Sequence, residues 1–263
     1  MINKKNNERV IEFDEKNFAF VDPNCGMLVG CVLGGKEIIH NSDNTSRRGI
    51  PILFPFANPL NDDTFDITGL QCPQHGFVRK HGWSYSENNH TNCTLIIDSD
   101  MISDNYKVFY PFSFELVQKI NIGDSFLEIN LEIINKGDVE MPIAPGFHPY
   151  FAIKESERAR LKIISGKENI NLGINWDETS SGYYFDYIDN TKLIYPSGHC
   201  VKIGSSITSE DDGYKIEKLV LWSEPKSDFI CVEQFARGTN GLNDNPIMVQ
   251  ANTTVNFSLR VTI

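Results

Sequence analysis

The chain has 263 residues, of which 40% are hydrophobic and 11% aromatic, so it can bury a large core. Its 24 basic and 35 acidic residues give a formal net charge of −11. This charge argues against nucleic acid or an anionic membrane as a partner, because both require a surplus of Lys and Arg. The start of the chain, Met1–Arg9, is too polar for a signal peptide, and no apolar run reaches the roughly 18 residues of a membrane span. We therefore predict a cytoplasmic protein, and small neutral or hydroxylated ligands fit its charge.

Strand-like runs recur along the chain between turn signals. Residues 126–134 and 254–263 alternate apolar with polar side chains, as expected for strands with one face on a core and one in water. Turn residues at 121–124, 135–138 and 211–213 separate neighbouring runs. In chain order, the predicted strands are Arg9–Phe13, Thr94–Asp98, Phe114–Ile120, Phe126–Ile134, Leu161–Ile164, Lys218–Trp222 and Thr254–Ile263.

This pattern predicts an all-β fold, a hairpin-rich antiparallel sandwich. The sequence has no long amphipathic helix, no repeat of fixed period, and no linker rich in Gly, Ser or Pro. We therefore expect residues 1–263 to form a single domain. The charged stretch Lys154–Arg160 is expected to be a solvated loop or a short turn of helix.

The cysteines and histidines form no metal or redox motif. Six cysteines occur without a C-x-x-C pair, and six histidines occur without H-x-H, H-x-x-H or H-E-x-x-H spacing. We expect buried free thiols and predict neither a metal nor a cofactor. The alternative is a metal-dependent enzyme that uses distant residues such as His75 and His148 as ligands.

Two segments contain candidates for acid-base chemistry. His148 lies between two prolines and three aromatic rings in Ala144–Phe151, and Glu233 lies in the apolar run Cys231–Phe235. A histidine titrates near neutrality, and partial burial raises a glutamate toward the same range, so the two could pass protons at physiological pH. The alternative is a structural histidine and a strand carboxylate that faces water.

Two further segments contain polar groups in unusual settings. Ser46–Phe56 runs from two arginines into an apolar stretch with prolines, and Pro73–Arg79 contains His75 beside a glycine. If the second segment is extended, His75 and Arg79 face the same pocket, whereas a bend at Gly76 separates them. Arginine and histidine provide donors and acceptors suited to sugar hydroxyls. The alternative is a pair of residues that stabilise a loop.

Four segments together resemble the ordered landmarks of the aldose 1-epimerase, or galactose mutarotase-like, family. They are Arg47–Pro55, Gln74–Arg79, Gly146–Phe151 and Leu221–Glu233, and the resemblance spans roughly residues 20–263. It implies a large twisted antiparallel β-sandwich with the sugar in an open cleft across one sheet. It also implies an isomerase that interconverts the α and β anomers of an aldohexose without a cofactor.

The resemblance also implies roles for individual residues. His148 matches the family's catalytic acid, Glu233 its catalytic base, and His75 a histidine that contacts the sugar near the ring oxygen. Glu233 would take the proton of the anomeric hydroxyl while His148 protonates the ring oxygen, and the ring would open and reclose. Acid and base contributions of roughly 10²- to 10⁴-fold each suffice for a reaction that already proceeds slowly in water.

The chain departs from the family pattern in one place. Many galactose mutarotases have an Asn-Arg pair after the first landmark, where this chain has Asn58 and Pro59, and a proline cannot make that contact. Arg79 and Arg47 are the natural substitutes, and their positions resemble those of the hexose-6-phosphate mutarotases, whose arginines hold a phosphate. The net charge favours a neutral aldose. A hexose 6-phosphate and a noncatalytic carbohydrate-binding protein are the alternatives.

Several residues keep two interpretations. The resemblance implies an aspartate on the sugar hydroxyls, and Asp177, Asp186 and Asp189 all qualify. We expect Trp222 to fill the core, with stacking on a sugar as the alternative. Edge strands of a sandwich could pair to give a homodimer. The loop after Glu233 is expected to contain ordinary turn residues, with ligand contact as the alternative for Arg237, Asn240 and Asn243.

Overall fold

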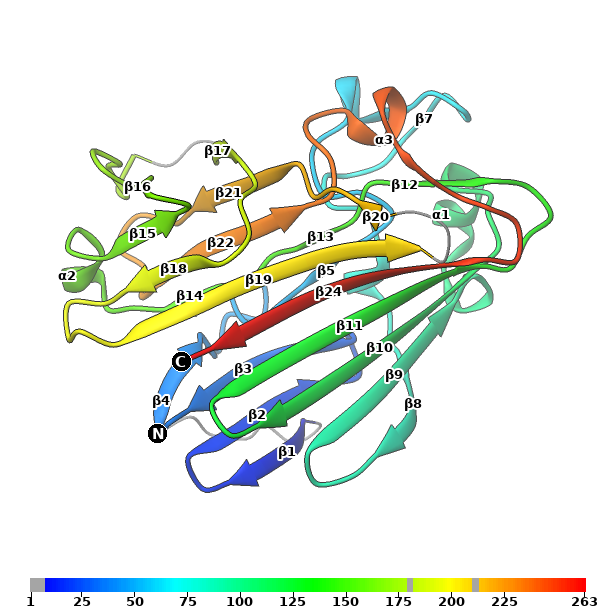
Figure 1. Ribbon diagram of the computed structural model, residues 1–263. Coiled ribbons are helices and arrows are strands. Elements are labelled where there is room, and N and C mark those ends of the chain that lie inside the picture. Colours follow the sequence, from blue (N-terminus) through cyan, green and yellow to red (C-terminus); the bar gives the residue numbers. More distant parts are fainter. Residues whose placement is uncertain (1–7, 179–181, 210–212) are drawn as a thin grey trace.

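The computed structural model describes residues 8–178, 182–209 and 213–263, and its architecture is two large antiparallel sheets packed face to face (Figure 1). The first sheet has ten strands, in the order β1-β2-β3-β4-β14-β22-β13-β5, with β21 also paired to β22 and β17 to β21. Its strands are β1 (Arg9–Asp14), β2 (Asn17–Asp22), β3 (Met27–Leu33), β4 (Lys36–Ile39), β5 (Ile52–Leu53), β13 (Gly146–Phe147), β14 (Tyr150–Ala152), β17 (Tyr183–Asp186), β21 (Lys218–Trp222) and β22 (Phe229–Phe235).

The second sheet also has ten strands, in the order β16-β15-β18-β19-β24-β11-β10-β9-β8, with β20 paired to β19. These strands are β8 (Ser84–Asn88), β9 (Asn92–Asp98), β10 (Phe114–Gly123), β11 (Phe126–Asn135), β15 (Lys162–Ser165), β16 (Glu168–Asn169), β18 (Thr191–Ile194), β19 (Cys200–Ser209), β20 (Gly213–Tyr214) and β24 (Thr254–Thr262). Two small ladders join β6 (Thr64–Phe65) to β7 (Leu70–Gln71) and β12 (Met141–Ile143) to β23 (Ile247–Val249).

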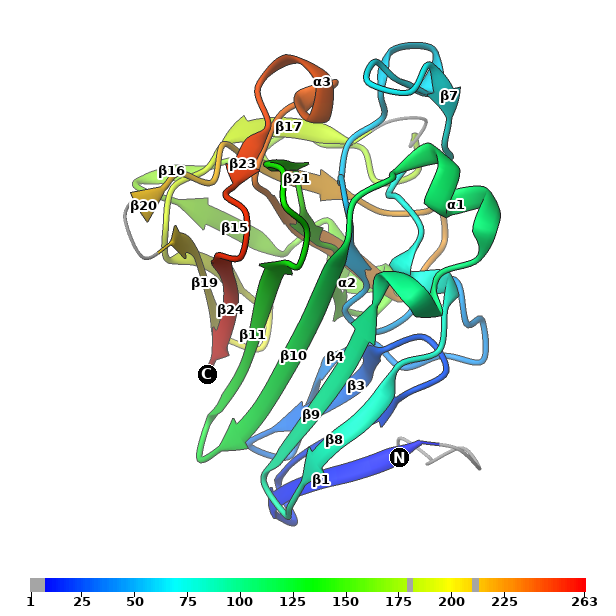
Figure 2. The ribbon, with the colours of Figure 1, turned by 90° about the vertical axis from the view of Figure 1, so that its right-hand side faces the viewer.

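Helices are short and peripheral in the described part of the chain. They are α1 (Asp104–Phe109), α2 (Glu155–Arg158), α3 (Gly241–Asp244) and the 3₁₀ turns η1 (Asn61–Asp63), η2 (Val78–Lys80) and η3 (Ser99–Met101). Figure 2 shows that α1, α3 and the β6–β7 hairpin gather at one end of the sandwich. Within the described residues, no helix is long and apolar enough to cross a membrane.

The all-β prediction is confirmed, and each of the seven predicted runs is a strand whose bounds differ from the prediction by a few residues at most. The alternation in β11 is complete, with every second side chain buried. The turn predicted at 121–124 falls slightly later, because Gly123 still pairs with Phe126 and the turn is Asp124–Ser125. The turn at 135–138 is present, and Gly137 donates its N–H to the Asn135 side chain. The turn predicted at 211–213 lies largely outside the described residues.

One hydrophobic core lies between the two sheets. It draws side chains from the facing surfaces of both, such as Ile230 and Val232 of β22 and Ile129 and Leu131 of β11. On the far side of β22, Cys231 belongs to a separate small cluster. Because successive residues of a strand point to opposite faces, Glu233 shares the face of Cys231 and points away from this core. Both faces of β22 are covered, since all seven of its residues are buried, and the functional candidates lie on its outer side.

The stretch Lys154–Arg160 is a short helical turn as expected, but the expectation that it is solvated is wrong for Arg158. This side chain is buried and donates to the Ser223 hydroxyl, to the carbonyl of Glu224 and to the carboxylate of Asp177. Its guanidinium therefore fixes the loop between β21 and β22. The sequence of a charged stretch does not indicate which of its residues is buried.

Candidate active site

Glu233 reaches the site because β22 lies in the middle of the first sheet. All seven residues of β22 are buried, since the core covers one face and loops cover the other. Strand β21 pairs with β22 so that Val220 lies opposite Glu233, and β17 pairs with β21 so that Tyr184 lies opposite Val220. The three residues therefore form one row across three strands. This register brings Tyr184, which the sequence analysis did not single out, to the same cavity as Glu233.

His148 lies between two short strands, β13 and β14, which both pair with β22. Its backbone N–H donates to the carbonyl of Pro51. Gly146 lets β13 lie close to its neighbours, because a Cβ at residue 146 would lie 2.6 Å from the Phe235 ring and 2.7 Å from the Ala57 side chain. His148 Nε2 lies 3.4 Å from a carboxylate oxygen of Glu233. Both residues are buried, with His148 6% exposed and Glu233 3% exposed. The predicted acid-base pair is therefore assembled in space.

Burial moves the two pKa values of this pair in opposite directions. Loss of water raises the pKa of Glu233 well above its ordinary range, and the nearby Arg79 charge opposes that rise. Loss of water lowers the pKa of His148 well below its ordinary range, and the positive side chains around it add to the effect. Each group disfavours its own charged form, so burial favours the state in which the pair holds a single proton. That proton belongs to the pair and not to either residue alone.

His75 lies beside His148, with ring centroids 5.5 Å apart and rings nearly perpendicular. The segment is bent and not extended, because His75 and Gly76 both have positive φ values of 73° and 64°. A Cβ at residue 76 would lie 2.1 Å from the carbonyl oxygen of Phe54, which requires glycine there. The bend continues into η2, which contains Arg79, and yet both His75 and Arg79 line one cavity. The predicted neighbours therefore meet, but through a bend and not along a strand.

The tautomer of His75 follows from its hydrogen bond. The ring atom Nδ1 contacts the carbonyl oxygen of Ala57, and a carbonyl can only accept, so Nδ1 carries the hydrogen. Burial and the Arg79 charge lower the pKa of His75 to about 4, so the ring is neutral near pH 7. Nε2 of His75 is then a hydrogen-bond acceptor and can receive a ligand hydroxyl.

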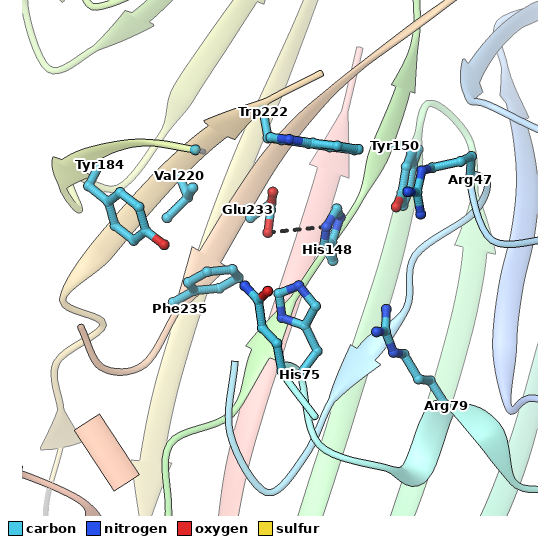
Figure 3. A pocket seen from close by; sticks show the side chains of 12 residues that line it. Arg47, His75, Arg79, His148, Tyr150, Tyr184, Val220, Trp222, Glu233 and Phe235 are labelled. Carbon is cyan, nitrogen blue, oxygen red and sulfur yellow. Dashed lines mark ion pairs between the residues drawn. The ribbon is translucent and has the colours of Figure 1, made fainter. Parts of the chain in front are cut away.

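The two predicted arginines lie toward one end of the cavity (Figure 3). Arg47 Nε donates to a carboxylate oxygen of Glu224, Nη1 donates to the carbonyl of Ser46, and the guanidinium lies 5.4 Å from the centre of the Trp222 ring. Within the described part of the chain, Arg79 makes no hydrogen bond or ion pair, although it lines the same cavity. Arg47 is therefore largely neutralised, whereas Arg79 faces the cavity with its donors unused.

The cavity has a volume of about 300 Å³, at the lower end of small-molecule sites. Figure 3 shows Trp222 and Phe235 on either side of the Glu233–His148 pair, with Tyr184 at the end opposite the arginines. The Tyr150 ring stacks on His148 at 4.8 Å. The lining residues are Arg47, Gln74, His75, Arg79, His148, Tyr150, Gly182, Tyr184, Val220, Trp222, Glu233 and Phe235.

The sequence analysis missed part of this lining. The expectation that Trp222 fills the core is wrong, because its ring is partly exposed and lies perpendicular to His148 at 6.1 Å. Tyr150 and Phe235 each follow a predicted catalytic residue by two positions and point the same way. Period-two spacing from His148 and Glu233 could therefore have identified both. The contribution of Gln74 is signalled only by its place next to His75.

None of the three candidate aspartates lines the cavity. Asp177 pairs with Arg158, Asp186 pairs with Lys218, and Asp189 accepts from the Tyr187 hydroxyl. The residues of the loop after Glu233 hold that loop together, as in the preferred interpretation. Arg237 donates to the carbonyls of Asn245, Lys215 and Ala236, and the side chains of Asn240 and Asn243 bond to each other and to neighbouring loops.

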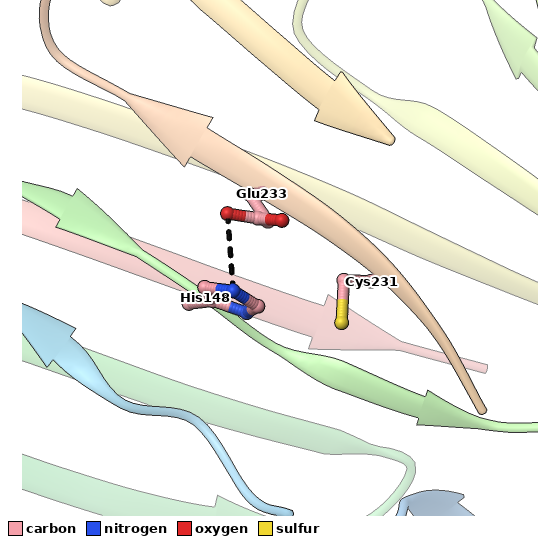
Figure 4. Close-up of side chains that lie close together, drawn as sticks. All are labelled: His148, Cys231 and Glu233. Atoms are coloured by element: carbon pink, nitrogen blue, oxygen red, sulfur yellow. Dashed lines mark ion pairs between the residues drawn. The ribbon is translucent and has the colours of Figure 1, made fainter. Parts of the chain in front are cut away.

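Among the described residues, one group has side chains at metal-ligand spacing. Ligand atoms of His148, Cys231 and Glu233 all lie within 4.8 Å of one another, and all three residues are buried (Figure 4). His75, which the sequence analysis considered as a ligand together with His148, is not part of this group. The cavity thus combines a one-proton acid-base pair, a neutral histidine acceptor, two aromatic walls and an arginine with unused donors.

The chain resembles known proteins both in sequence and in fold. A family model described as "Aldose 1-epimerase" matches residues 28–174, which is more than half of the chain. No curated protein matches the sequence. The structure is similar to the Slr1438 protein of Synechocystis sp., with a TM-score of 0.79, 23% identity, and coverage of 100% of this chain and 99% of that one.

Two further solved structures have the same fold. A galactose mutarotase related enzyme from Lactobacillus acidophilus has a TM-score of 0.77 and 16% identity, with 97% and 96% of the two chains covered. A galactose 1-epimerase from the same species has a TM-score of 0.69 and 15% identity, with 99% and 96% covered. The sandwich is thus of the galactose mutarotase type. The match of the family model shows that the chain belongs to the aldose 1-epimerase family.

Proposed function

We propose that this chain interconverts the α and β anomers of an aldohexose, with His148 and Glu233 as the catalytic residues. The observation that carries the proposal is the buried pair itself, in which the two groups lie 3.4 Å apart and burial disfavours the charged form of each. Mutarotation needs one proton removed from the anomeric hydroxyl and one delivered to the ring oxygen. A pair that shares one proton can do both without exchanging protons with water.

The proton transfers balance in the following way. The proton of the pair first passes from Glu233 to His148, and the carboxylate of Glu233 then takes the proton of the anomeric hydroxyl while the imidazolium of His148 gives its proton to the ring oxygen. The bond between C1 and the ring oxygen breaks, C1 becomes an aldehyde carbon, and the pair is left as a carboxylic acid and a neutral imidazole. Burial favours this neutral form of the pair, so it favours the ring-opened stage. Rotation about the C1–C2 bond and reversal of both transfers give the other anomer.

Other lining residues would hold the sugar in place. The neutral His75 accepts a hydrogen bond from a sugar hydroxyl through Nε2, because Nδ1 is occupied by the Ala57 carbonyl. The rings of Trp222 and Phe235 contact the apolar faces of the pyranose. Tyr184 already donates its hydroxyl hydrogen to Asn58, which leaves the oxygen as an acceptor for a second sugar hydroxyl.

The arginine end of the cavity bears on the class of sugar. Glu224 neutralises Arg47, and the backbone of Glu224 is held by the buried Arg158, so this ion pair is built into the loop. We therefore propose a neutral aldose as the substrate. A hexose 6-phosphate is the second candidate. The unused donors of Arg79 and the Nη2 group of Arg47 could together bind a phosphate.

Relaxation of optical rotation after dissolving pure α-D-glucose or α-D-galactose tests the proposal. We expect the protein to accelerate relaxation over buffer alone at catalytic concentration, and more strongly for one sugar than for the other. Glucose 6-phosphate is measured in parallel. Acceleration of the phosphorylated sugar alone would replace the neutral substrate by the second candidate.

A noncatalytic carbohydrate-binding protein is distinguished by the same assay together with calorimetry. Sugar binding at a 1:1 ratio without acceleration of any of the three sugars would contradict the proposed enzyme activity. The function would then be binding alone.

A further inference from the structure

The proposed reaction leaves unused one buried thiol that lies next to the catalytic pair. Cys231 precedes Glu233 by two positions on β22, so its thiol points to the same side of the sheet, as Figure 4 shows. The residue is fully buried, and it packs beside Tyr150, Phe229 and Trp222. A thiol, an imidazole and a carboxylate thus meet at one point beneath the cavity.

The spacing of the three ligand atoms is close to that of a metal site. Zinc binds nitrogen and oxygen at about 2.0–2.1 Å and sulfur at about 2.3 Å, so neighbouring ligands of a tetrahedral ion lie roughly 3.3–3.8 Å apart. His148 Nε2 and the Glu233 oxygen are already 3.4 Å apart. The Cys231 sulfur lies within 4.8 Å of both, so it needs to approach by about 1.5 Å at most, which a change of side-chain rotamer can supply.

The donor set selects the kind of cation. A sulfur, a nitrogen and a single carboxylate suit Zn²⁺ or Cd²⁺, whereas Mg²⁺ and Ca²⁺ prefer oxygen ligands alone. Three protein ligands leave one coordination position, and this position opens toward the cavity that His148 and Glu233 line. We propose that His148, Cys231 and Glu233 form a binding site for a thiophilic divalent cation, and that occupancy of this site blocks the acid-base pair.

A second observation indicates that such an ion exchanges and is not a permanent part of the protein. A metal-bound histidine usually donates its other ring N–H to a carboxylate or a carbonyl, which strengthens and orients it. His148 Nδ1 is buried and has no hydrogen-bond partner among the described residues. Without that support, the site is expected to bind its ion reversibly, so a chelator removes it.

Inhibition follows from the identity of the ligand atoms. The ion uses the lone pairs of His148 and Glu233 that would otherwise accept protons, so an occupied site cannot pass protons to a sugar. Binding rests on geometry alone, whereas the inhibition rests on the proposed function. The two parts are therefore measured separately.

The test begins with a titration of the full chain with Cd²⁺, followed through the ultraviolet charge-transfer band of a cadmium–thiolate bond. Calorimetry with Zn²⁺ gives the stoichiometry. The variants are Cys231→Ala and Cys231→Ser, and the matched control is Cys31→Ala, which removes an equally buried free thiol from β3 of the same sheet. Cys231→Ser preserves the size of the side chain in case the alanine variant does not fold.

We expect wild type and Cys31→Ala to bind one ion with the thiolate band, and the two Cys231 variants to lose the band and bind at least about tenfold more weakly. Zn²⁺ should stop wild-type mutarotation, and a chelator should restore it. A band that survives in the folded Cys231 variants, or the lack of 1:1 binding by wild type, would overturn the site. Zinc bound at 1:1 with full activity would overturn the inhibition only. A wild type that binds the ion but turns over no sugar in its absence would contradict the proposed function and not the site.

Discussion

The strands β11 and β22 lie in the middles of the two sheets, and both have glutamates that point away from the core. The glutamates of β11 are partly exposed to water, whereas the glutamate of β22 is buried. In β11, Glu128 and Glu132 point to the outer face, which is open to water, and they pair there with Arg260 and Lys119. In β22, Glu233 also points away from the intersheet core, but loops cover it and its neighbour is the uncharged His148. A carboxylate on the open face is an ordinary surface charge, whereas burial on the covered face raises the pKa of Glu233.

The cause of the difference is the covering layer and not the strand. The segments that contain Arg47 and His75 close over the outer face of the first sheet beside Glu233 and exclude water from β22. Exclusion of water raises the pKa of Glu233 and lowers that of His148, which gives the one-proton pair. The second sheet has no such layer over β11, because half of its side chains remain partly exposed.

The largest expected effect comes from removing the histidine of the covered face. His148→Gln should lower the mutarotation rate by about 10²- to 10⁴-fold, because it removes a general acid. The control is His90→Gln, a change at an exposed histidine, which should leave the rate unchanged. Stopped-flow polarimetry measures both. A His148→Gln protein as active as wild type would remove His148 from the mechanism.

The pH dependence of the wild-type rate sharpens the comparison. The one-proton state is lost in acid when both groups are protonated and in alkali when both are deprotonated. Because the pKa of His148 is lowered and that of Glu233 is raised, the acid limb should lie below pH 6.5 and the alkaline limb well above pH 4.5, the ordinary values of the two groups. The result should be a broad plateau whose apparent limits belong to the pair. Rates corrected for buffer catalysis measure it, and a narrow optimum between two unshifted values would contradict the account.

The stability of Glu233→Gln provides a test without a substrate. Burial raises the pKa of Glu233 above its unfolded value of 4.5, so wild type loses stability as pH rises above 4.5 while the folded carboxyl stays protonated. The glutamine variant escapes this loss and should be more stable by about 1–3 kcal/mol near neutral pH. The gain should vanish at pH 4, where both proteins are neutral at this position. Thermal unfolding at the two pH values measures it.

The open face provides the matched control for that experiment. Glu132→Gln makes the same chemical change at a partly exposed position of β11 and should give no gain at either pH. A neutral-pH gain of equal size in both variants would show that the covering layer does not distinguish the two strands.

The smallest expected effect concerns the ion pair at the edge of the cavity. Glu224→Gln frees Arg47 and should raise the preference for glucose 6-phosphate over glucose by about two- to fivefold, since a partly exposed ion pair contributes little. Glu128→Gln breaks the pair with Arg260, which is similarly exposed and lies on the open face. That control should leave the preference unchanged. Competition between the two sugars in one assay measures the ratio.

The sequence predicted the strands better than the covering layer. Alternation identified β11 and β24 because each has one wet face. The motifs singled out His148, Glu233, His75, Arg79 and Arg47, and all five line one cavity. The inward turn of Arg158 and the cavity position of Trp222 depend on how loops pack, and the row from Tyr184 to Glu233 depends on how β17, β21 and β22 pair. Those contacts join residues far apart in the chain, so local sequence patterns cannot predict them.

The most direct test of the central claim is magnetisation exchange between the α and β anomeric proton signals of the preferred sugar at equilibrium. Wild type, Glu233→Gln and Glu132→Gln are compared at equal concentration, with sugar affinity measured alongside. The account predicts rapid exchange with wild type and Glu132→Gln, and exchange slower by at least about a hundredfold with Glu233→Gln at nearly unchanged affinity. Exchange at the wild-type rate in folded Glu233→Gln would contradict the role of the covered carboxylate.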